Sequence, residues 1–460
     1  MKKVCIQGLG FVGASMAVAL STARDKSGSP SFDIVGIELP TKLGKKRVND
    51  INGGKFPFIT SDQSLLDALS IAHSTGNISA SVDDSALKDA DIILVSIHLD
   101  ISYLDKEPVI EFDNFKNAIR SIGKHIKPGA LLIIETTVPP GTCEKIVKPQ
   151  IEQELQKRGM TRDSYLLAHS YERVMPGDEY LDSIINFWRV YAGDNEAAAD
   201  ACEQFLTEVI NVEKYPLTRL SSTLASETAK ILENSYRASN IAFIDEWSKF
   251  AENVGIDLFE VVDAIRLRPT HSNIRFPGLG VGGYCLTKDP AFVKASVRQI
   301  FNQDMNFPFV DMTININNEM TLHAAKRMEK LLGGNINNKR ILICGVSYKQ
   351  DIDDTRNSPS EILFRYLNSR GSKLSATDPL VTYWAELDID ILADLPEADC
   401  LDGIIFAVGH QEYKKIDINS WLHNCNAIVL DANNVLTDGQ KNKAREAGIS
   451  IEMIGKADGL

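Results

Sequence analysis

A cysteine in a glycine-rich loop is the residue of this sequence best suited to covalent chemistry. Residues 278–289 read GLGVGGYCLTKD, so Cys285 follows a flexible run of glycines and precedes Lys288 and Asp289. Such a loop can present a thiol to a ligand, and a nearby positive charge favours the thiolate, which is the nucleophilic form. The alternative is an inert buried thiol, which is the usual state of a cysteine. The loop alone leaves both interpretations open.

Lys230 and Asn234 are candidates for contacting a substrate oxygen. They lie four residues apart in a long helical pattern, so they share one face and can point at the same atom. This spacing is common, and by itself it favours an ordinary solvent-exposed pair. A functional interpretation needs another feature that connects this helix to Cys285.

Two further segments carry groups that suit acid–base chemistry. Thr136 and Thr137, in ETTVPPGT, follow a predicted strand, where ligands bind in open α/β sheets. Their hydroxyls can position an alcohol or a water, or they can simply cap a proline-rich turn. Glu172, in SYERVMPG, is either a general base or a surface acid, and in isolation the surface acid is favoured. The histidines show no metal-ligand spacing such as HExxH, so we predict no metal site.

A glycine motif near the N-terminus predicts a dinucleotide site. Gly8, Gly10 and Gly13 form G-x-G-x-x-G between a predicted strand and a helix. These glycines permit a tight turn, close approach of a pyrophosphate and helix–strand packing, and the helix N-terminus supplies N–H groups. The second strand ends at Glu38, whose carboxylate can accept from ribose hydroxyls and repels a 2′-phosphate. We therefore predict NAD rather than NADP; the alternative is a glycine turn without a nucleotide.

The elements that position these residues follow an alternating pattern of strands and helices. Short apolar runs and helical patterns alternate over the first 210 residues and again beyond Gly333 and Gly334, and a helical pattern at 222–254 joins the two parts. The aromatic stripe of that helix favours core or subunit-interface packing. We predict an α/β fold with two Rossmann-like doubly wound domains joined by a long central helix. The predicted domains are 1–215 (NAD-binding), 216–332 (central helical, with the Cys285 loop) and 333–460 (C-terminal, Rossmann-like).

Composition excludes several classes of protein. The 460 residues include 49 Lys and Arg against 62 Asp and Glu, and the resulting net charge of −13 argues against binding nucleic acid or an anionic membrane. The apolar runs are far shorter than the ~20 residues that a membrane-spanning helix needs. The seven cysteines are scattered and contain no CxxC pair, which disfavours a disulfide framework and a structural zinc site. We expect a cytoplasmic protein.

Six motifs, in order along the chain, resemble those of the UDP-sugar 6-dehydrogenase family. The resemblance covers nearly the whole sequence. The motifs are GLGFVG (8–13), ETTVPPGT (135–142), SYERVMPG (170–177), AKILENSYRASNIAF (229–243), PGLGVGGYCLTKD (277–289) and GVSYKQDIDDTRNSP (345–359).

The resemblance implies NAD-dependent oxidation of the C6 hydroxyl of a UDP-hexose to a carboxylate by two hydride transfers. In this family's pattern Cys285 is the nucleophile that traps the aldehyde as a thiohemiacetal, which a second hydride transfer converts to a thioester. Lys230 stabilises the developing oxyanions, and Asn234 shares that hydrogen bonding. Asp289 and Thr136 match positions that hold the catalytic water or accept the first proton.

The resemblance also implies that residues 333–460 form the UDP-sugar-binding domain, and it implies roles for further residues. Glu172 matches the acid assigned to thioester hydrolysis, and Lys349 and Arg356 match residues that hold the UDP-sugar, as cations suited to a diphosphate. Arg268 lies near a position from which some members reach the partner subunit's site. In this family the long helix also forms the dimer interface, so the resemblance implies a homodimer. The cofactor-binding set comprises Gly8, Gly10, Phe11, Val12, Gly13, Glu38, Thr137 and Lys288.

Some segments depart from the family's usual pattern or differ between its branches, and they bear on which substrate to expect. HLDISYLDKEP (98–108) departs from the family's usual Thr-Pro turn against the dinucleotide. SYERVMPG, LENSYRASNIAF and AVGHQEY (407–413) resemble the UDP-N-acetylhexosamine branch, whereas Lys288-Asp289 resembles the UDP-glucose branch, so the N-acetylhexosamine is only slightly favoured. The alternative functions are a single-step 3-hydroxyacid dehydrogenase, which needs no Cys285, and a catalytically silent NAD-binding regulatory protein.

Overall fold

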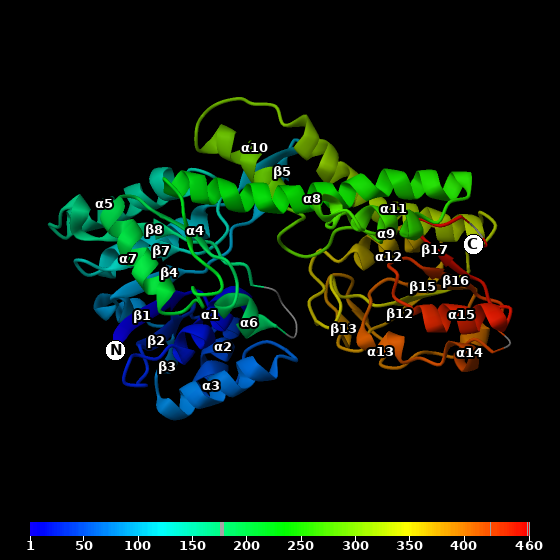
Figure 1. Ribbon diagram of the computed structural model, residues 1–460, viewed down its shortest axis with the longest axis horizontal. Helices are drawn as coiled ribbons and strands as arrows, with labels where there is room; N and C mark the ends of the chain where they lie inside the picture. The colour runs from blue at the N-terminus through cyan, green and yellow to red at the C-terminus, as the bar shows by residue number, and fades with distance from the viewer. Residues whose placement is uncertain (175–178, 424, 458, 460) are drawn as a thin grey trace. The chain divides into compact units, whose positions relative to one another are not determined.

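The computed structural model describes residues 1–174, 179–423, 425–457 and 459 (Figure 1). Part of the SYERVMPG motif, residues 175–177, therefore lies outside the described residues. The chain divides into two compact units. The first comprises residues 1–233 and 291–306, and the second comprises residues 234–290 and 307–460. The division into three domains expected from the sequence stays a prediction.

The first unit is built on an eight-stranded sheet with the strand order β10-β9-β8-β7-β4-β1-β2-β3. Neighbouring strands are parallel except β8 and β9, which pair antiparallel. The predicted doubly wound α/β fold is thus confirmed with a mostly parallel sheet, in which β9 and β10 run opposite to the other six strands. The strands are β1 (Lys2–Gln7), β2 (Phe32–Ile37), β3 (Ile78–Ser81), β4 (Ile92–Val95), β7 (Leu131–Ile134), β8 (Leu166–His169), β9 (Val190–Gly193) and β10 (Thr218–Arg219).

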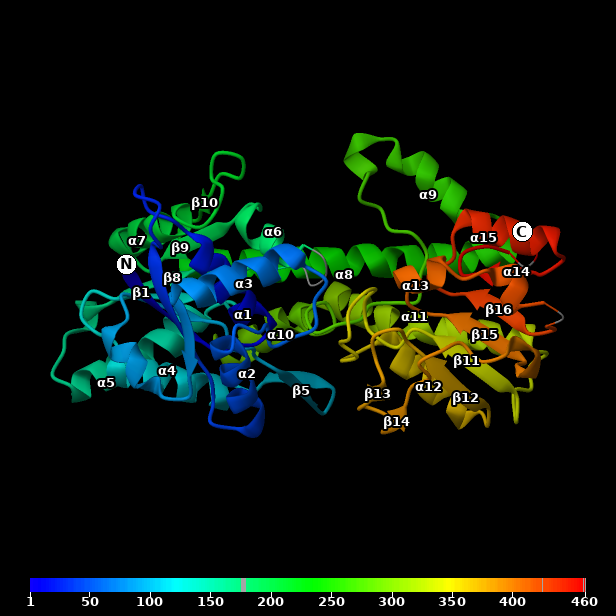
Figure 2. The same cartoon turned by 90° about the horizontal axis from the view of Figure 1, so that it is seen from below.

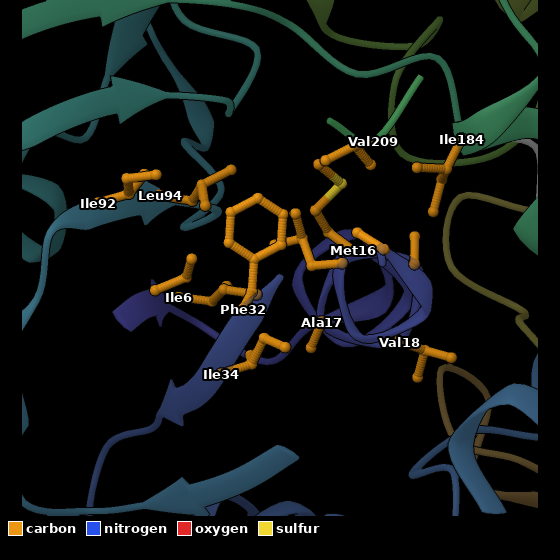
Figure 3. Close-up of a cluster of buried hydrophobic side chains, with 14 of the residues drawn as sticks. Ile6, Met16, Ala17, Val18, Phe32, Ile34, Ile92, Leu94, Ile184 and Val209 are labelled. Atoms are coloured by element: carbon orange, nitrogen blue, oxygen red, sulfur yellow. The ribbon is translucent and has the colours of Figure 1, made fainter. Parts of the chain in front are cut away.

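Both faces of this sheet are covered, which explains why its strands are continuous apolar runs. Successive residues of a strand point to opposite faces, so Ile92 and Leu94 enter one buried cluster while Ile93 and Val95 enter another. Figure 3 shows part of the first cluster, in which residues of helix α1 face those of the central strands.

Helices of the first unit supply the other half of each cluster. Beside the first cluster lie α1 (Phe11–Thr22), α2 (Lys42–Asn52), α3 (Gln63–Thr75), α6 (Tyr180–Ile185) and α7 (Glu196–Thr207). Beside the second lie α4 (Asp113–His125), α5 (Lys148–Lys157) and the later turns of α10 (Asp289–Gln299). Helices α1 and α3 lie side by side (Figure 1). Short elements are the hairpin β5 (Ile101–Leu104) and β6 (Glu107–Ile110), and the helical turns Asp84–Asp89, Cys143–Val147 and Arg162–Ser164.

The second unit has a smaller, all-parallel sheet with the order β12-β11-β15-β16-β17. Helices α11 and α12, which lie side by side (Figure 2), cover one face, and α13, α14 and α15 cover the other. The strands are β11 (Arg340–Cys344), β12 (Lys373–Thr377), β15 (Gly403–Phe406), β16 (Ile428–Asp431) and β17 (Ile451–Met453), with the short pair β13 (Tyr383–Trp384) and β14 (Ile389–Asp390). The helices are α9 (Leu258–Arg266), α11 (Pro308–Leu331), α12 (Pro359–Ser369), α13 (Gln411–Lys414), α14 (Ile418–Trp421) and α15 (Asp438–Glu446), with the turns Pro269–His271 and Ala398–Cys400.

The predicted long helix is α8 (Thr223–Val254), which is continuous over 32 residues. Helix α11 begins at Pro308, because proline is tolerated in the first helical turn. Both units are α/β with parallel sheets, as the sequence predicts. Among the helices of the described residues, none is both long and apolar enough to cross a membrane.

Candidate active site

The glycine turn of the first unit has the geometry that a dinucleotide requires. Gly8 has a φ of +98°, which favours glycine. A Cβ on Gly13 would lie 1.9 Å from the Gly8 carbonyl oxygen, so only glycine allows the close approach of helix to strand. A Cβ on Gly10 would meet no atom within 4 Å, so this position borders open space. Phe11 and Val12 form the first turn of α1 directly behind it.

Glu38 lies at the carboxyl end of β2, beside this turn. Its Oε1 accepts from the backbone N–H of Leu9 at 3.0 Å, and its Oε2 accepts from that of Leu39 at 3.2 Å. The carboxylate is thus fixed against the glycine turn (Gly8 to Gly13), where a ribose is expected in this fold. Open space at Gly10, the helix N-terminus behind it and the fixed acid fit an NAD molecule.

The Thr136 loop is anchored by buried charges on both sides. Glu135, immediately before it, pairs with Arg189 at 2.5 Å and accepts from Ser96 Oγ at 2.9 Å. Burial raises the pKa of Glu135, although Arg189 opposes the shift. Beyond the loop, Glu227 of α8 accepts from the backbone N–H groups of Gly141 and Cys143 at 2.6 and 2.7 Å.

These anchors fix the threonines to different degrees. Thr136 is buried, and its Oγ1 donates to the Val95 carbonyl at 3.1 Å. Thr137 is half-buried. The loop is therefore held between the sheet edge and α8, with Thr136 bonded back to the neighbouring strand.

Lys230 and Glu172 are brought together in the first unit. Lys230 Nζ donates to the backbone carbonyl of Glu172 at 2.8 Å and lies 5.3 Å from the centre of the Tyr171 ring. The Glu172 carboxylate accepts from the Val174 N–H at 2.6 Å. Arg173 pairs with Glu233 of α8 at 2.9 Å, which ties the same segment to the helix. Lys230 is buried, so it is not the exposed residue that its spacing alone favoured.

His169, at the end of β8, is a buried histidine close to this cluster. Its Nδ1 lies 2.8 Å from Ser226 Oγ, one turn before Lys230 on α8. Burial, with a contribution from the Lys230 charge, lowers the pKa of His169 to about 3. The imidazole is therefore neutral at physiological pH, and it leaves Lys230 as the positive charge at this point.

Cys285 and its neighbours form a second cluster, in the second unit. Cys285 is exposed, and its carbonyl accepts from the N–H groups of Lys288 and Asp289 at 3.2 and 2.9 Å. A Cβ on Gly283, which has a φ of +82°, would lie 2.6 Å from a ring carbon of Tyr348. Glycine is therefore required where the loop passes this ring, and the tight turn that comes next holds the cysteine at its surface.

Asn234 joins α8 to this cysteine turn. Its Nδ2 donates to Asp289 Oδ2 at 2.7 Å, and Lys288 Nζ pairs with Asp289 Oδ1 at 2.9 Å. The Asp289 side chain is fully buried. This is the link between helix and cysteine loop that the spacing of Lys230 and Asn234 lacked. The positive charge of Lys288 is balanced by Asp289.

A cavity of about 300 Å³ lies at the carboxyl edge of the second unit's sheet. Its lining includes Lys349 and Lys414, together with Ser347, Tyr348 and Asn434. Two cations and several polar groups at one strand edge suit an anionic ligand. Lys349, predicted to hold substrate, is therefore placed in a cavity.

The other two predicted substrate residues lie elsewhere in the second unit. Arg356 pairs with Asp354 at 2.6 Å and lies 5.6 Å from the centre of the Tyr284 ring, next to Cys285. Arg268 is exposed at the start of the turn Pro269–His271.

Sequence reasoning missed several residues that support these clusters. Glu227, Arg189 and Tyr171 bind the predicted residues or their loops from other elements. One feature of the sequence could have indicated Glu227: it lies three residues before Lys230, and therefore on a related face of α8. No feature of the sequence indicated Arg189, because its partner Glu135 is 54 residues away.

Comparison with known proteins decides the family. Three models of one family match in order: the NAD binding domain at residues 2–210, the central domain at 224–319 and the UDP binding domain at 342–438 of the UDP-glucose/GDP-mannose dehydrogenase family. The chain belongs to the UDP-glucose/GDP-mannose dehydrogenase family. It is an NAD-dependent UDP-sugar 6-dehydrogenase, as the six motifs predict.

Individual relatives cover almost the whole chain. A UDP-N-acetyl-D-mannosamine dehydrogenase of Methanocaldococcus jannaschii is 29% identical over 95% of this chain and 93% of its own. A UDP-N-acetyl-D-glucosamine 6-dehydrogenase of Pseudomonas aeruginosa is 26% identical over 90% and 92%. The solved structure of a UDP-D-ManNAc dehydrogenase from Pyrococcus horikoshii has a TM-score of 0.80 at 24% identity and covers 99% of this chain and 100% of its own, which shows the common fold.

Proposed function

We propose that this dehydrogenase oxidises C6 of a UDP-N-acetylhexosamine to the carboxylate, with Cys285 as a covalent nucleophile. The observation that carries the mechanism is the exposed Cys285 on a turn joined to the Asn234–Asp289–Lys288 cluster. The names of the relatives support an N-acetylated sugar. UDP-glucose is the alternative substrate.

In the first stage, the residues of the chain must remove a proton from the C6 hydroxyl and stabilise the resulting charge. NAD, when bound, supplies a nicotinamide that accepts a hydride from carbon, and the overall oxidation needs two such transfers. Lys230 supplies a buried, fixed positive charge for the developing oxyanion, because electrostatic stabilisation is strongest where water is excluded. Thr136 and Asp289 are the candidates for handling the proton or the catalytic water.

In the second stage, Cys285 bonds to the aldehyde carbon and retains it. Its sulfur adds to the carbonyl to give a thiohemiacetal, whose oxidation gives a thioester. Water then attacks the acyl carbon and the cysteine sulfur leaves, so the thiol is regenerated with the acid. Asn234 donates to oxygen, and Glu172 assists the attack of water.

The second unit supplies the binding site for the nucleotide part of the substrate. Lys349 lines the cavity at its sheet edge, and Arg356 lies beside the cysteine loop through Tyr284. Both are cations suited to the diphosphate of the UDP-sugar. Arg268 is exposed and is the candidate for reaching a partner subunit.

A homodimer is the assembly that we propose. The face of α8 that carries Tyr236, Phe243, Trp247, Phe250 and Val254 repeats at three-, four- and seven-residue intervals, and each of these side chains is about half exposed. A contiguous apolar helix face is typical of a protein–protein interface, and self-pairing of the same face gives a two-fold dimer.

The seven cysteines, all described and none in a disulfide, fit a reducing, cytoplasmic compartment.

A substrate panel with a Cys285→Ala variant tests this proposal. We expect the wild type to reduce NAD with UDP-N-acetylhexosamines and to use UDP-glucose at a kcat/KM at least about tenfold lower. Cys285→Ala should still bind NAD and UDP-sugar but produce no uronate at a significant rate. Uronate formation by Cys285→Ala at the wild-type rate would refute the covalent mechanism, and preference for UDP-glucose would refute the substrate assignment.

A further inference from the structure

Glu38, the carboxylate expected to receive the NAD ribose, is already paired with a cation. Arg47 Nη1 donates to Glu38 Oε1 at 2.9 Å, the same oxygen that accepts from Leu9 N–H. Arg47 lies on α2, whose N-terminus follows β2 after a short turn capped by Thr41. Both side chains of the pair are largely buried, with 23% of Arg47 and 11% of Glu38 exposed.

An aromatic stack holds Arg47 from its other side. The guanidinium carbon lies 5.2 Å from the centre of the Phe58 ring, and Phe58 stacks on Phe11 with ring centres 4.1 Å apart. Phe11 is the first helical residue after the glycine turn. A planar guanidinium stacks well on an aromatic face, so Arg47 is held between Glu38 and Phe58, and Phe58 is in turn packed on Phe11 beside the glycine turn.

This arrangement changes how the site distinguishes NAD from NADP. A lone carboxylate at the end of the second strand repels a 2′-phosphate by its charge. A carboxylate bonded to a guanidinium has much of that charge balanced locally. Rejection of NADP then depends on the carboxylate occupying the position beside the ribose, with a phosphate-binding group directly behind it.

We propose that Arg47 is a specificity-determining residue of the cofactor site. With Glu38 present, Arg47 positions the carboxylate for the ribose hydroxyls of NAD. Without that carboxylate, the fixed guanidinium binds the 2′-phosphomonoester of NADP, because guanidinium groups form charge-assisted hydrogen bonds with phosphate oxygens.

Titration calorimetry with NAD and NADP, in the absence of sugar, tests this assignment on purified full-length protein. Glu38→Ser should weaken NAD binding by about tenfold or more and strengthen NADP binding by about tenfold or more. Adding Arg47→Ala to Glu38→Ser should abolish the gain for NADP. Adding Lys46→Ala instead should preserve it, because Lys46→Ala removes the same charge from an exposed position on the same helix.

Two further results complete the test. Arg47→Ala alone should weaken NAD binding severalfold while the melting temperature of the apoprotein stays near the wild-type value. Glu38→Ala, which also vacates the position beside the ribose, provides a second background if Glu38→Ser is unstable. A gain for NADP that persists without Arg47, no gain in either Glu38 variant, or unchanged NAD binding in Arg47→Ala would each overturn the assignment.

Discussion

At the scale of single residues, burial decides which charges the first unit carries near its site. His169 is neutral because burial lowers its pKa, whereas Lys230 is held by the Glu172 carbonyl and the Tyr171 ring. Glu227 is buried on the same helix and fixes the loop beyond Thr136. The chemistry proposed for Lys230 therefore depends on neighbours that touch no substrate.

Replacing Lys230 tests its electrostatic role. Lys230→Met preserves the length and packing of the side chain but removes the charge. We expect kcat to fall by about 10² to 10³ while the dissociation constant for NAD stays within about twofold, because the charge acts on the oxyanion rather than on the cofactor. Stopped-flow NADH formation and calorimetry measure the two quantities. A loss confined to NAD affinity would contradict this role.

Glu227 gives the stability of the protein a defined pH dependence. Burial raises its pKa to about 7, from an ordinary value of 4.5, although the backbone N–H groups of Cys143 and Gly141 oppose the shift. The folded protein therefore holds this proton more tightly than the unfolded chain does. Its contribution to stability is present in full below pH 4.5 and is lost as the pH rises to 7, a change of roughly 3 kcal/mol.

Glu227→Gln isolates this contribution. The variant should be less stable than the wild type at pH 5, because Gln cannot accept from both Gly141 and Cys143 N–H. The stability difference between the two proteins should shrink as the pH rises from 5 to 7.5, because only the wild type loses the Glu227 contribution. Melting temperatures at both pH values measure it. A difference that stays constant or grows would contradict the raised pKa.

At the scale of elements, the sequence predicts the positions of most strands because each buried strand is a short apolar run bounded by polar residues. It also predicts the turns that need glycine, such as Gly8 and Gly13, because no other residue fits there. It does not predict that β9 and β10 run opposite to the rest of the sheet, since pairing direction depends on the chain path and not on local composition. The contacts that fix Thr136, from Arg189 and Glu227, depend on partners far apart in the sequence.

The glycine turn allows two substitutions to be compared. A Cβ at position 10 meets no atom within 4 Å and the backbone there is extended, whereas a Cβ at position 13 meets the Gly8 carbonyl at 1.9 Å. Gly10→Ala should fold with a near-normal melting temperature but bind NAD at least about tenfold more weakly, because the methyl fills the space for the pyrophosphate. Gly13→Ala should lower the melting temperature itself. Calorimetry and thermal denaturation separate the two effects, and the reverse pattern would contradict the assignment.

At the scale of the whole molecule, the sheets of the two units differ in the loop that follows the first strand. This difference fits an NAD binding domain in the first unit and a UDP binding domain in the second. Gly345 has the same φ of +98° as Gly8, but 13 residues separate it from α12, where only two separate Gly8 from α1. Asp378, which comes after β12 as Glu38 comes after β2, is buried and accepts from four backbone N–H groups and from His410. Burial opposes ionisation, but these bonds outweigh it and hold the pKa of Asp378 below its usual value. Its carboxylate stabilises the loop before Lys349, where Val346 and Ser347 N–H donate to it, whereas Glu38 is placed for a ribose.

The proposed dimer makes a separate prediction at this scale. The double variant Trp247→Glu/Phe250→Glu places two charges on the exposed face of α8 and should give monomers, because burying them in an apolar interface is unfavourable. Ile71→Glu, at an exposed apolar residue on α3, is the matched control and should leave the assembly unchanged. Light scattering after gel filtration measures the mass. A double variant that remains dimeric would exclude this face.

The central claim is that one active site carries out both oxidation steps through Cys285. The most direct measurement is the number of NADH molecules formed per molecule of limiting UDP-N-acetylhexosamine by the wild-type protein. Complete conversion through a cysteine thioester predicts two NADH and one uronate per sugar. One NADH per sugar, with the aldehyde as the final product, would contradict the claim and indicate simple alcohol oxidation.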